Sequence, residues 1–336
     1  MSSYQNGTQK PHKYMKISVI VCTHNPREDY LRRTLEGLEQ QTLPQDRWEL
    51  LLIDNSSKEP LSGKWDLSWH PQGRHVLEEE LGLTPARLRG IREAKGDLLV
   101  FVDDDNVLDR DYLQQALEIA GRMPLLGCFG AGHLEPEYEE EPENALRAYV
   151  GMLALRTVSE PRWSNVPDDP WVPWGAGLCV TRLVAQQHMK EVCGSETSSM
   201  LDRKGSELNS GGDDEFSWTA CAMGLGRGIF PALQVLHLID RRRVQPEYLL
   251  RIAEGHAFSS SILKSLHGKE LVEVSGSPKF LSVMSGFFRL SPSLFFYEGQ
   301  RWWNARKAGK TVAAFDKAFY DGVGRARRFL DSKVSG

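Results

Sequence analysis

The sequence lacks the features of several large protein classes. No apolar run approaches the ~20 residues that a membrane-spanning helix needs, and the polar first fourteen residues have no signal-peptide core. The 41 Lys and Arg are outnumbered by 45 Asp and Glu, so the chain has no broad basic balance for nucleic acid. We therefore predict a cytoplasmic globular protein that binds no nucleic acid, with a disordered leader over residues 1–15.

Cysteine pairs and several common catalytic motifs are also missing. The five cysteines are Cys22, Cys128, Cys179, Cys193 and Cys221. Their odd number and the lack of a Cys-x-x-Cys pair indicate neither a disulfide framework nor a zinc knuckle, so we expect reduced core residues. No GxxxxGK[ST], HExxH or GxSxG segment occurs. The glycines of 224–230 precede a strand pattern, the reverse of a dinucleotide-binding turn.

Strand and helix patterns alternate in the first half of the chain. Apolar runs at 16–22, 48–54 and 97–102 predict strands, and the segments 28–41 and 85–96 between them have helical spacing. Strands that are apolar on both faces and joined by helices imply a parallel sheet covered on both sides. We therefore predict an α/β fold with a mostly parallel, Rossmann-like central sheet flanked by helices.

The second half of the chain is less regular. Six glutamates and two prolines at 133–143 predict a solvated loop, and a helix is expected over 143–158. Further helices are predicted at 213–224 and 246–266, with a strand at 227–240 between them. The rest of the chain, to its end, is expected to be a helical extension.

Three adjacent aspartates follow the strand pattern that ends at residue 102. Carboxylates this close repel one another, and each costs several kcal/mol to desolvate unless it is neutralised. On an extended chain Asp103 and Asp105 project to one side and Asp104 to the other, which makes a site for a hard cation such as Mg²⁺ or Mn²⁺. The alternative is helix capping, but Asp109 and Asp111 already supply that charge.

Five segments in order resemble the family 2 glycosyltransferases of the GT-A fold. They are ISVIVCTHN, LLIDNSS, GLTPARLRGIREAKGDLLVFVDDDN, GGDDEFSW and HLIDRRRVQPEYLL, and they span about residues 16–255. The resemblance implies inverting sugar transfer from a nucleotide diphosphate donor to a hydroxyl of a glycan or lipid-linked acceptor, assisted by Mn²⁺ or Mg²⁺, in glycan or cell-envelope polysaccharide synthesis. It also implies a nucleotide-sugar half (16–124), an acceptor and catalytic half (125–245) and a helical C-terminal region (246–336).

The resemblance assigns donor-binding residues mainly to strand ends. Those matched to nucleotide or diphosphate contacts are Thr23, His24, Asn25, Asp54, Arg87, Asp103, Asp104, Arg241 and Arg243. Asp103 and Asp105 match the DxD pair that holds the metal, and His237 matches a late histidine that completes the metal site. Without the resemblance, the residues of the first loop are turn formers, His237 is a core or turn residue, and the arginines form a solvated basic turn.

Catalysis and acceptor binding are assigned to two later segments. In GGDDEFSW the resemblance implies the general base that takes the acceptor proton, with Asp213 the best match and Asp214 and Glu215 as alternatives. Spacing alone indicates an acidic helix start. The family's acceptor loop is matched by Trp171, Trp174 and Gly175. The two tryptophans either stack on a sugar face or pack in the core.

Two other functions stay open at this stage. A nucleotidyltransferase uses a similar sheet and a carboxylate-bound metal, but it releases pyrophosphate rather than a nucleoside diphosphate. A catalytically silent protein would bind a sugar nucleotide or a carbohydrate without transfer. A plausible base at Asp213 argues against the silent protein.

The C-terminal tail is basic and aromatic. Residues 301–333 hold nine Lys and Arg against three Asp, interleaved with aromatic side chains that include Trp302 and Trp303. This composition is typical of a helix that lies on anionic lipid at the inner face of a membrane. The alternative is an amphipathic helix packed on its own domain.

Overall fold

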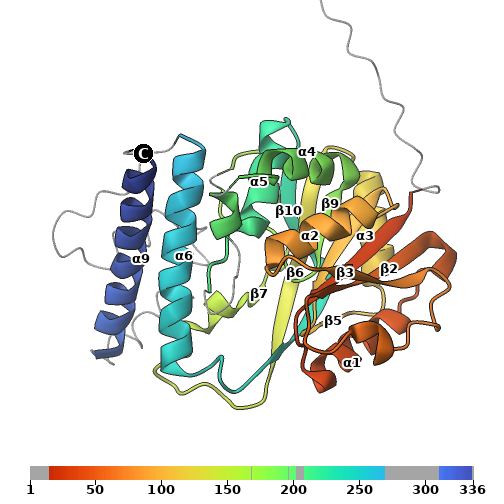
Figure 1. Ribbon diagram of the computed structural model, residues 1–336, viewed down its shortest axis with the longest axis horizontal. Coiled ribbons are helices and arrows are strands. Elements are labelled where there is room, and N and C mark those ends of the chain that lie inside the picture. The colour runs from red at the N-terminus through yellow and green to blue at the C-terminus, as the bar shows by residue number, and fades with distance from the viewer. Residues whose placement is uncertain (1–14, 168, 196, 202–207, 269–309, 335–336) are drawn as a thin grey trace, which may run out of the picture.

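The computed structural model describes residues 15–167, 169–195, 197–201, 208–268 and 310–334. Within them the chain forms one ten-stranded sheet with helices on both faces, and two long helices stand beside it (Figure 1). The predicted α/β class is confirmed. The expected leader, apart from Met15, and the tail residues Trp302 and Trp303 lie outside the described residues.

The first half alternates strands and helices as predicted. Its elements are β1 (Ile17–Thr23), α1 (Glu28–Glu39), β2 (Trp48–Asn55), β3 (Gly73–Glu78), α2 (Leu83–Glu93), β4 (Leu98–Asp103), β5 (Asn106–Leu108) and α3 (Tyr112–Arg122). All eight residues of β2 are buried, as expected of an apolar run in the middle of a covered sheet. Short 3-10 turns at Gln45–Arg47 and Leu61–Gly63 complete the connections.

The second half contains more strands than predicted. Its elements are β6 (Leu126–Tyr138), β7 (Arg156–Thr157), β8 (Arg162–Ser164), β9 (Leu178–Thr181), α4 (Arg182–Val192), α5 (Gly212–Ala222), β10 (Gly226–Ile239), α6 (Pro246–Leu266) and α9 (Lys310–Val334). The predicted helices around 213–224 and 246–266 and the strand at 227–240 are confirmed.

Two predictions for this half are wrong. Residues 133–138 continue β6 rather than forming a loop, because they pair in parallel with Gln234–Ile239 of β10 while Glu135 and Glu137 alternate to the solvent side. The helix expected over 143–158 is instead a run of turns, one 3-10 segment at Val150–Leu153 and the short strand β7. The apolar residues of this segment are nonetheless buried, since Leu146, Tyr149 and Leu153 belong to a cluster packed against α6.

The sheet order is β3-β2-β1-β4-β9-β6-β10-β5, with β7 beside β6 and β8 beside β10. The pairs β3-β2, β2-β1, β1-β4 and β6-β10 are parallel, while β9 is antiparallel to both β4 and β6. It follows that β1, β2, β3, β4, β6 and β10 all run in one direction. The sheet is therefore mixed, and the carboxyl ends of its main strands meet at one edge.

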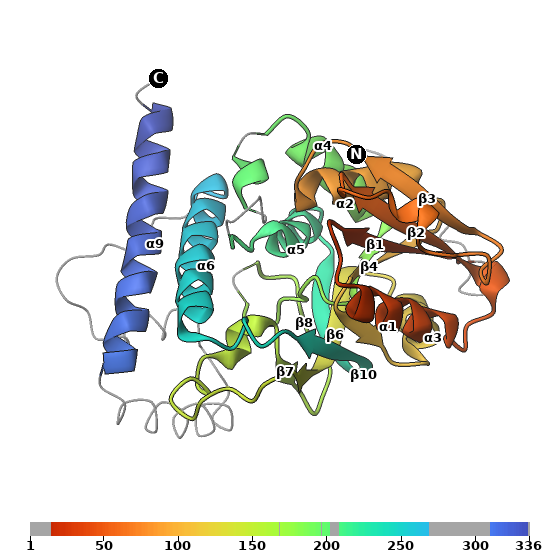
Figure 2. The same cartoon turned by 60° about the horizontal axis from the view of Figure 1, so that its bottom comes forward.

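Alternate residues of each strand enter two separate cores. On one face Ile17, Val19 and Val21 of β1 join apolar residues of α1 and α3, whereas Ile20 faces α2, α4 and α5 on the other. Figure 2 shows α1 and α3 below the sheet and the other three helices above it. This two-sided burial explains why the central strands read as continuous apolar runs.

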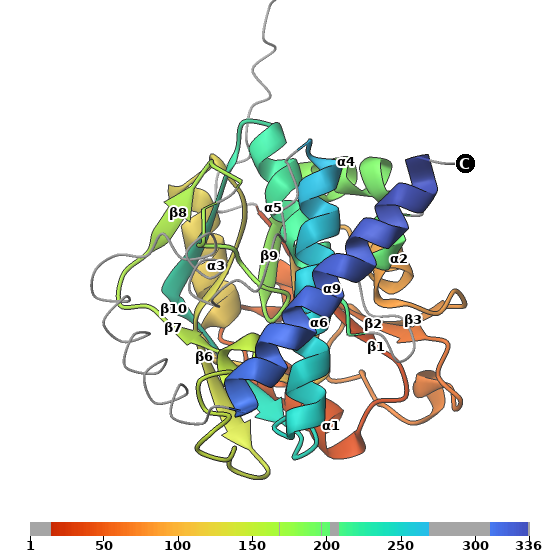
Figure 3. The same ribbon diagram turned by 90° about the vertical axis from the view of Figure 1, so that its left-hand side faces the viewer.

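The helices α6 and α9 pack on each other beside the sheet (Figure 3). Phe315 of α9 stacks on Tyr149 with ring centroids 3.6 Å apart, and Ala326 is fully buried. This is the packed alternative for the tail, and contact of the other face of α9 with lipid stays a prediction. None of the helices in the described ranges is long and apolar enough to cross a membrane.

Two local expectations also change. Asp111 occupies the N-cap position of α3, but its side chain makes no cap and instead accepts a hydrogen bond from Thr42 Oγ1 at 2.7 Å. Of the cysteines, Cys128 and Cys179 are core residues as expected. Cys193 is exposed, because it follows the last turn of α4 at the surface.

The contact between α6 and α9 depends on Gly322. A Cβ atom there would overlap the carbonyl oxygen of Glu254 and lie 2.9 Å from the Cβ of Ala257. We predict that Gly322→Ala lowers the free energy of unfolding by about 1–3 kcal/mol, as overpacking does.

Gly324→Ala is the matched control, because the added methyl group meets only the end of Arg328 at 3.5 Å. Higher helix propensity should leave this variant unchanged or more stable by up to about 1 kcal/mol. Urea unfolding of both variants measures the difference. Equal midpoints would show that the two helices do not pack through Gly322.

Candidate functional site

The candidate site lies at the sheet edge where the main strands end. The residues that follow β1, β2, β4 and β10 all come to this edge, because these strands run in one direction. Open α/β sheets bind ligands beyond the carboxyl ends of their strands. The structure thus brings the aspartates after β4 near the first loop and the last strand, although these segments are far apart in sequence.

The three aspartates do not continue as an extended chain. β4 ends at Asp103, and residues 104 and 105 turn into β5, so the alternation assumed from the sequence is wrong there. Asp104 accepts a hydrogen bond from the hydroxyl of Thr23. Burial, followed by the charges of Asp105 and Asp103, raises the pKa of Asp104 to about 7. Desolvated negative charge is therefore concentrated at this turn.

Asp105 is held by residues of β10 and the loop after it. Its Oδ2 atom lies 2.6 Å from Nη1 of Arg243 and 3.4 Å from Nε2 of His237. Arg243 Nη1 is also 3.1 Å from that histidine nitrogen. A backbone hydrogen bond of 2.8 Å from Leu238 N to the carbonyl of Asp105 fixes the two segments side by side. His237 and Asp105 are thus brought together as the metal assignment requires.

This arrangement fits a cation that takes only some of its ligands from the protein. No group of three or more His, Cys, Asp or Glu able to hold a metal occurs within the described ranges. Mg²⁺ is usually bound by one or two carboxylates together with substrate phosphates, rather than by a complete protein cage. Asp105 and His237 supply one oxygen and one nitrogen, and Arg243 already places positive charge beside both of them.

The polar residues at the ends of β1 and β2 stabilise the loops that follow these strands through hydrogen bonds. His24 Nδ1 is 2.7 Å from the carbonyl of Asn55, and His24 Nε2 is 2.7 Å from Nδ2 of Asn25. Both oxygens of the buried Asp54 accept backbone N–H groups, from Ser57 and Leu61, at 3.0 Å. These are the contacts of turn-forming residues, and their contact with a nucleotide stays a prediction.

Asp213 lies at the start of α5 and is held from two other elements. Its Oδ2 atom accepts the N–H of Gly175 at 2.7 Å, and its Oδ1 lies 2.6 Å from Nη2 of the buried Arg87 on α2. A Cβ at Gly175 would lie 2.7 Å from Arg87 Nη2 and 2.8 Å from Asp213 Oδ2, so a side chain at this position would displace the ion pair. The arginine that the resemblance assigns to the nucleotide is therefore paired with the candidate base.

The two neighbouring acids have different surroundings. Burial and the charge of Asp213 raise the pKa of Asp214 to about 7, although Arg227 and Arg156 oppose this shift. Glu215 is only 8% exposed. Asp214 therefore exchanges a proton near neutral pH, which keeps it as an alternative base on chemical grounds.

The two tryptophans of the predicted acceptor loop both contact arginines. The guanidinium carbon of Arg156 lies 3.1 Å from the ring centroid of Trp174, and that of Arg162 lies 5.3 Å from Trp171. Trp174 also packs against the core between the sheet and α1 and α3. Core packing is thus observed for Trp174, and sugar stacking stays a prediction for both rings. Neither arginine belongs to a motif that the sequence analysis assigned to the site.

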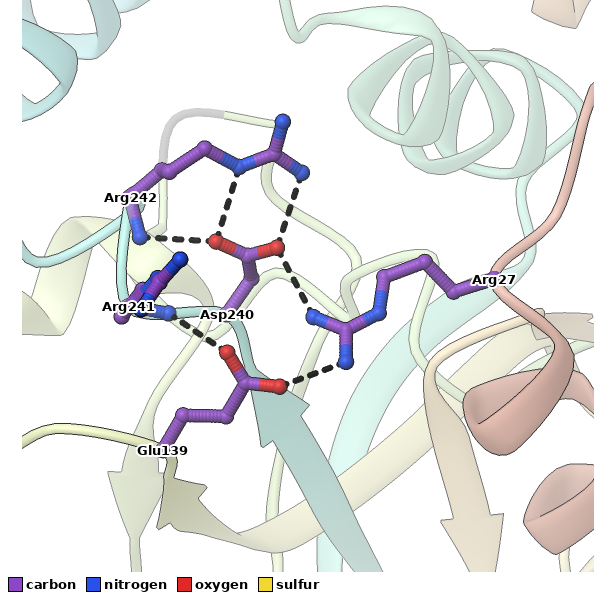
Figure 4. A pocket seen from close by; sticks show the side chains of 5 residues that line it. All are labelled: Arg27, Glu139, Asp240, Arg241 and Arg242. Atoms are coloured by element: carbon purple, nitrogen blue, oxygen red, sulfur yellow. Dashed lines mark hydrogen bonds and ion pairs between the residues drawn. The ribbon is translucent and has the colours of Figure 1, made fainter.

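Sequence reasoning also missed a charged pocket at the rim of this edge (Figure 4). Arg27, which follows the first loop, lies 2.9 Å from Asp240 and 2.6 Å from Glu139. Arg242 pairs with Asp240 at 2.8 Å, and the Arg241 N–H donates to Glu139 at 3.1 Å. The hydrogen bond from Arg242 contributes most to a lowered pKa of Asp240. This network fixes the loop that carries Arg243.

Comparison with known proteins covers mainly the first half. Residues 18–149 match the sequence profile of glycosyl transferase family 2. EpsH of Bacillus subtilis is 30% identical over 122 residues, 35% of this chain and 35% of its own length. Glycosyltransferase AglE of Haloferax volcanii is 25% identical over 104 residues (30% and 34%). Poly(ribitol-phosphate) beta-N-acetylglucosaminyltransferase TarS of Staphylococcus aureus is 27% identical over 105 residues (30% and 18%). The aligned segment thus spans about a third or less of these relatives.

A solved structure resembles almost the whole chain. The mannosyltransferase PcManGT from Pyrobaculum calidifontis, in complex with GDP-Man and Mn²⁺, superposes with a TM-score of 0.53 over 98% of this chain and 82% of that one. At 18% sequence identity this likeness supports the fold alone. Residues 18–149 thus match glycosyl transferase family 2 in sequence, and the chain around them has the GT-A fold.

Proposed function

We propose that this chain is a metal-dependent, inverting glycosyltransferase that moves a sugar from a nucleotide diphosphate donor to an acceptor hydroxyl. The observation that carries the proposal is the meeting of Asp105, His237 and Arg243 at the carboxyl edge of a family 2 sheet. The names of TarS and AglE support sugar transfer, and TarS supports a cell-envelope polysaccharide or lipid-linked glycan as acceptor. Mn²⁺ or Mg²⁺ is the cation class that such ligands take.

The donor is proposed to bind over residues 16–124 together with the loop after β10. Asp105 and His237, with Asp103 beside them, would hold the cation, which neutralises the diphosphate when bound. Arg243 and Arg241 lie on the loop that faces this edge and would stabilise the charge that develops on the departing diphosphate. The base and ribose contacts are assigned to the loops after β1, β2 and β4, namely Thr23, His24, Asn25, Asp54 and Asp104.

Asp213 is proposed as the general base. The Gly175 N–H and Arg87 hold its carboxylate in one orientation beside the proposed acceptor loop. In that position the carboxylate would take the proton of the acceptor hydroxyl as its oxygen attacks the anomeric carbon from the face opposite the diphosphate. Arg87 acts in this proposal as a positioning residue. The acceptor would be bound within residues 125–245.

The first test concerns Asp105. Asp105→Ala removes the carboxylate that is placed beside His237, so Mn²⁺-dependent binding of a nucleoside diphosphate and sugar transfer should fail together. We expect a loss of affinity at least as large as the roughly 10–100-fold caused by removing an outer-shell partner of a metal site. Isothermal titration of UDP and GDP with Mn²⁺, beside a transfer assay, measures both.

Asp111→Ala is the control, since it removes an exposed carboxylate from the next connection, between β5 and α3. It should retain both binding and transfer. Unchanged Mn²⁺-dependent binding in Asp105→Ala would contradict the metal assignment. Release of pyrophosphate instead of nucleoside diphosphate would identify a nucleotidyltransferase.

The second test separates proton transfer from donor binding. Asp213→Asn keeps the shape of the side chain but removes the basic oxygen, so transfer should fall by about 10²–10⁴-fold with donor affinity and metal dependence nearly intact. Asp214→Asn and Glu215→Gln are compared in the same assay. A larger loss of turnover in either of these two variants, or near-normal turnover in Asp213→Asn, would move the base away from Asp213.

A further inference from the structure

The position of Arg243 bears on how a cation reaches the site. Its Nη1 atom lies 2.6 Å from Asp105 Oδ2 and 3.1 Å from His237 Nε2, and these two atoms are 3.4 Å apart. The side chains of Arg243, Asp105 and His237 are only 12%, 18% and 5% exposed. One nitrogen with positive charge therefore contacts both atoms that are assigned to the metal.

Arginine and a divalent ion compete for the same two ligand atoms. Oxygen and nitrogen ligands bind Mg²⁺ or a similar ion at about 2.0–2.2 Å, so an ion bound by both atoms must lie close to the line that joins them. Nη1 contacts both atoms from one side, and the lone pair of His237 Nε2 cannot serve both an N–H donor and a metal. Two positive charges at this separation would also repel strongly in a desolvated site.

The surrounding loop allows Arg243 to change partners without unfolding. Asp240 and Glu139 are bound by Arg27, and Arg242 also pairs with Asp240, so these carboxylates hold the loop independently of Arg243. The Nε atom of Arg243 is buried without a hydrogen-bond partner. A diphosphate arriving at this edge would offer anionic oxygens, which arginine binds through two parallel hydrogen bonds.

We propose that Arg243 occupies the cation site of the free protein and yields Asp105 and His237 to a divalent ion when a nucleoside diphosphate binds, taking phosphate as its new partner. The exchange of partners rests on the proposed function, whereas the competition between Arg243 and the ion does not. Cation and nucleotide then each raise the affinity for the other, because both favour the state in which Arg243 has left Asp105.

Mn²⁺ titration of the whole protein tests this exchange. Without nucleotide, Arg243→Gln should bind Mn²⁺ about tenfold or more tightly than wild type, since the charge-assisted bonds that oppose the ion are gone. With saturating Mn²⁺, the same variant should bind UDP or GDP about tenfold more weakly. Arg242→Gln is the matched control, because it removes one positive charge from an adjacent position that is 78% exposed. It should change neither affinity appreciably.

The Mn²⁺ titration and the nucleotide titration test separate parts of the proposal. Unchanged or weaker binding of Mn²⁺ alone in Arg243→Gln overturns the competition, and unchanged nucleotide binding overturns the transfer of Arg243 to phosphate. A wild type that binds no nucleotide with Mn²⁺ contradicts the proposed function and leaves the Mn²⁺ arm intact. If Arg243→Gln does not fold, Arg243→Lys takes its place, since one ammonium group cannot bridge both atoms as well. Its affinity for Mn²⁺ should rise, and no rise overturns the competition.

Discussion

Negative charge at the end of a buried strand has to be neutralised, and much of this site follows from that requirement. Asp104 and Asp105 stand where β4 leaves the core, too close together for both to be ionised without nearby positive charge or hydrogen-bond donors. Thr23, at the end of β1, donates a hydrogen bond to Asp104. Arg243 and His237 contact Asp105. These partners are more than 200 residues apart in the sequence. Their contacts with the two aspartates hold the end of β1 next to the end of β10.

At the proposed base site, negative charge is also neutralised by partners from other elements. Asp213 begins α5, Arg87 belongs to α2, and Gly175 precedes β9, so the ion pair and the backbone hydrogen bond join three separate segments. The absence of a side chain at Gly175 lets the backbone approach the carboxylate. Arg87 thus joins α2 to the start of α5, and displacement of this arginine would disturb the orientation of the Asp213 carboxylate.

Sequence patterns anticipated the elements with strong periodicity and the residues within motifs. α6 has the predicted ends, and the family resemblance assigns Asp105 and His237 to one site, where their side chains lie 3.4 Å apart. The failures have physical causes. The strand at 133–138 depends on pairing with a segment about a hundred residues away in the sequence. The turn at residues 104 and 105 ends the strand, and the local sequence pattern does not predict that turn. The ion pairs of Arg27 and Arg87 are set by tertiary packing, so the local sequence does not show which carboxylates these arginines contact.

β9 runs opposite to its neighbours β4 and β6, and this direction places the loop before β9 at the proposed acceptor site. Leu178, its first residue, faces Phe101 near the end of β4, so the chain that enters β9 arrives at the edge where the parallel strands finish. A strand of the usual direction would deliver its preceding loop to the opposite edge. The inverted strand β9 therefore gives the carboxyl edge a loop whose length and composition can change while the register of the parallel strands stays the same. Under the proposed function, acceptor choice and nucleotide recognition would thereby be separable in the architecture of the sheet.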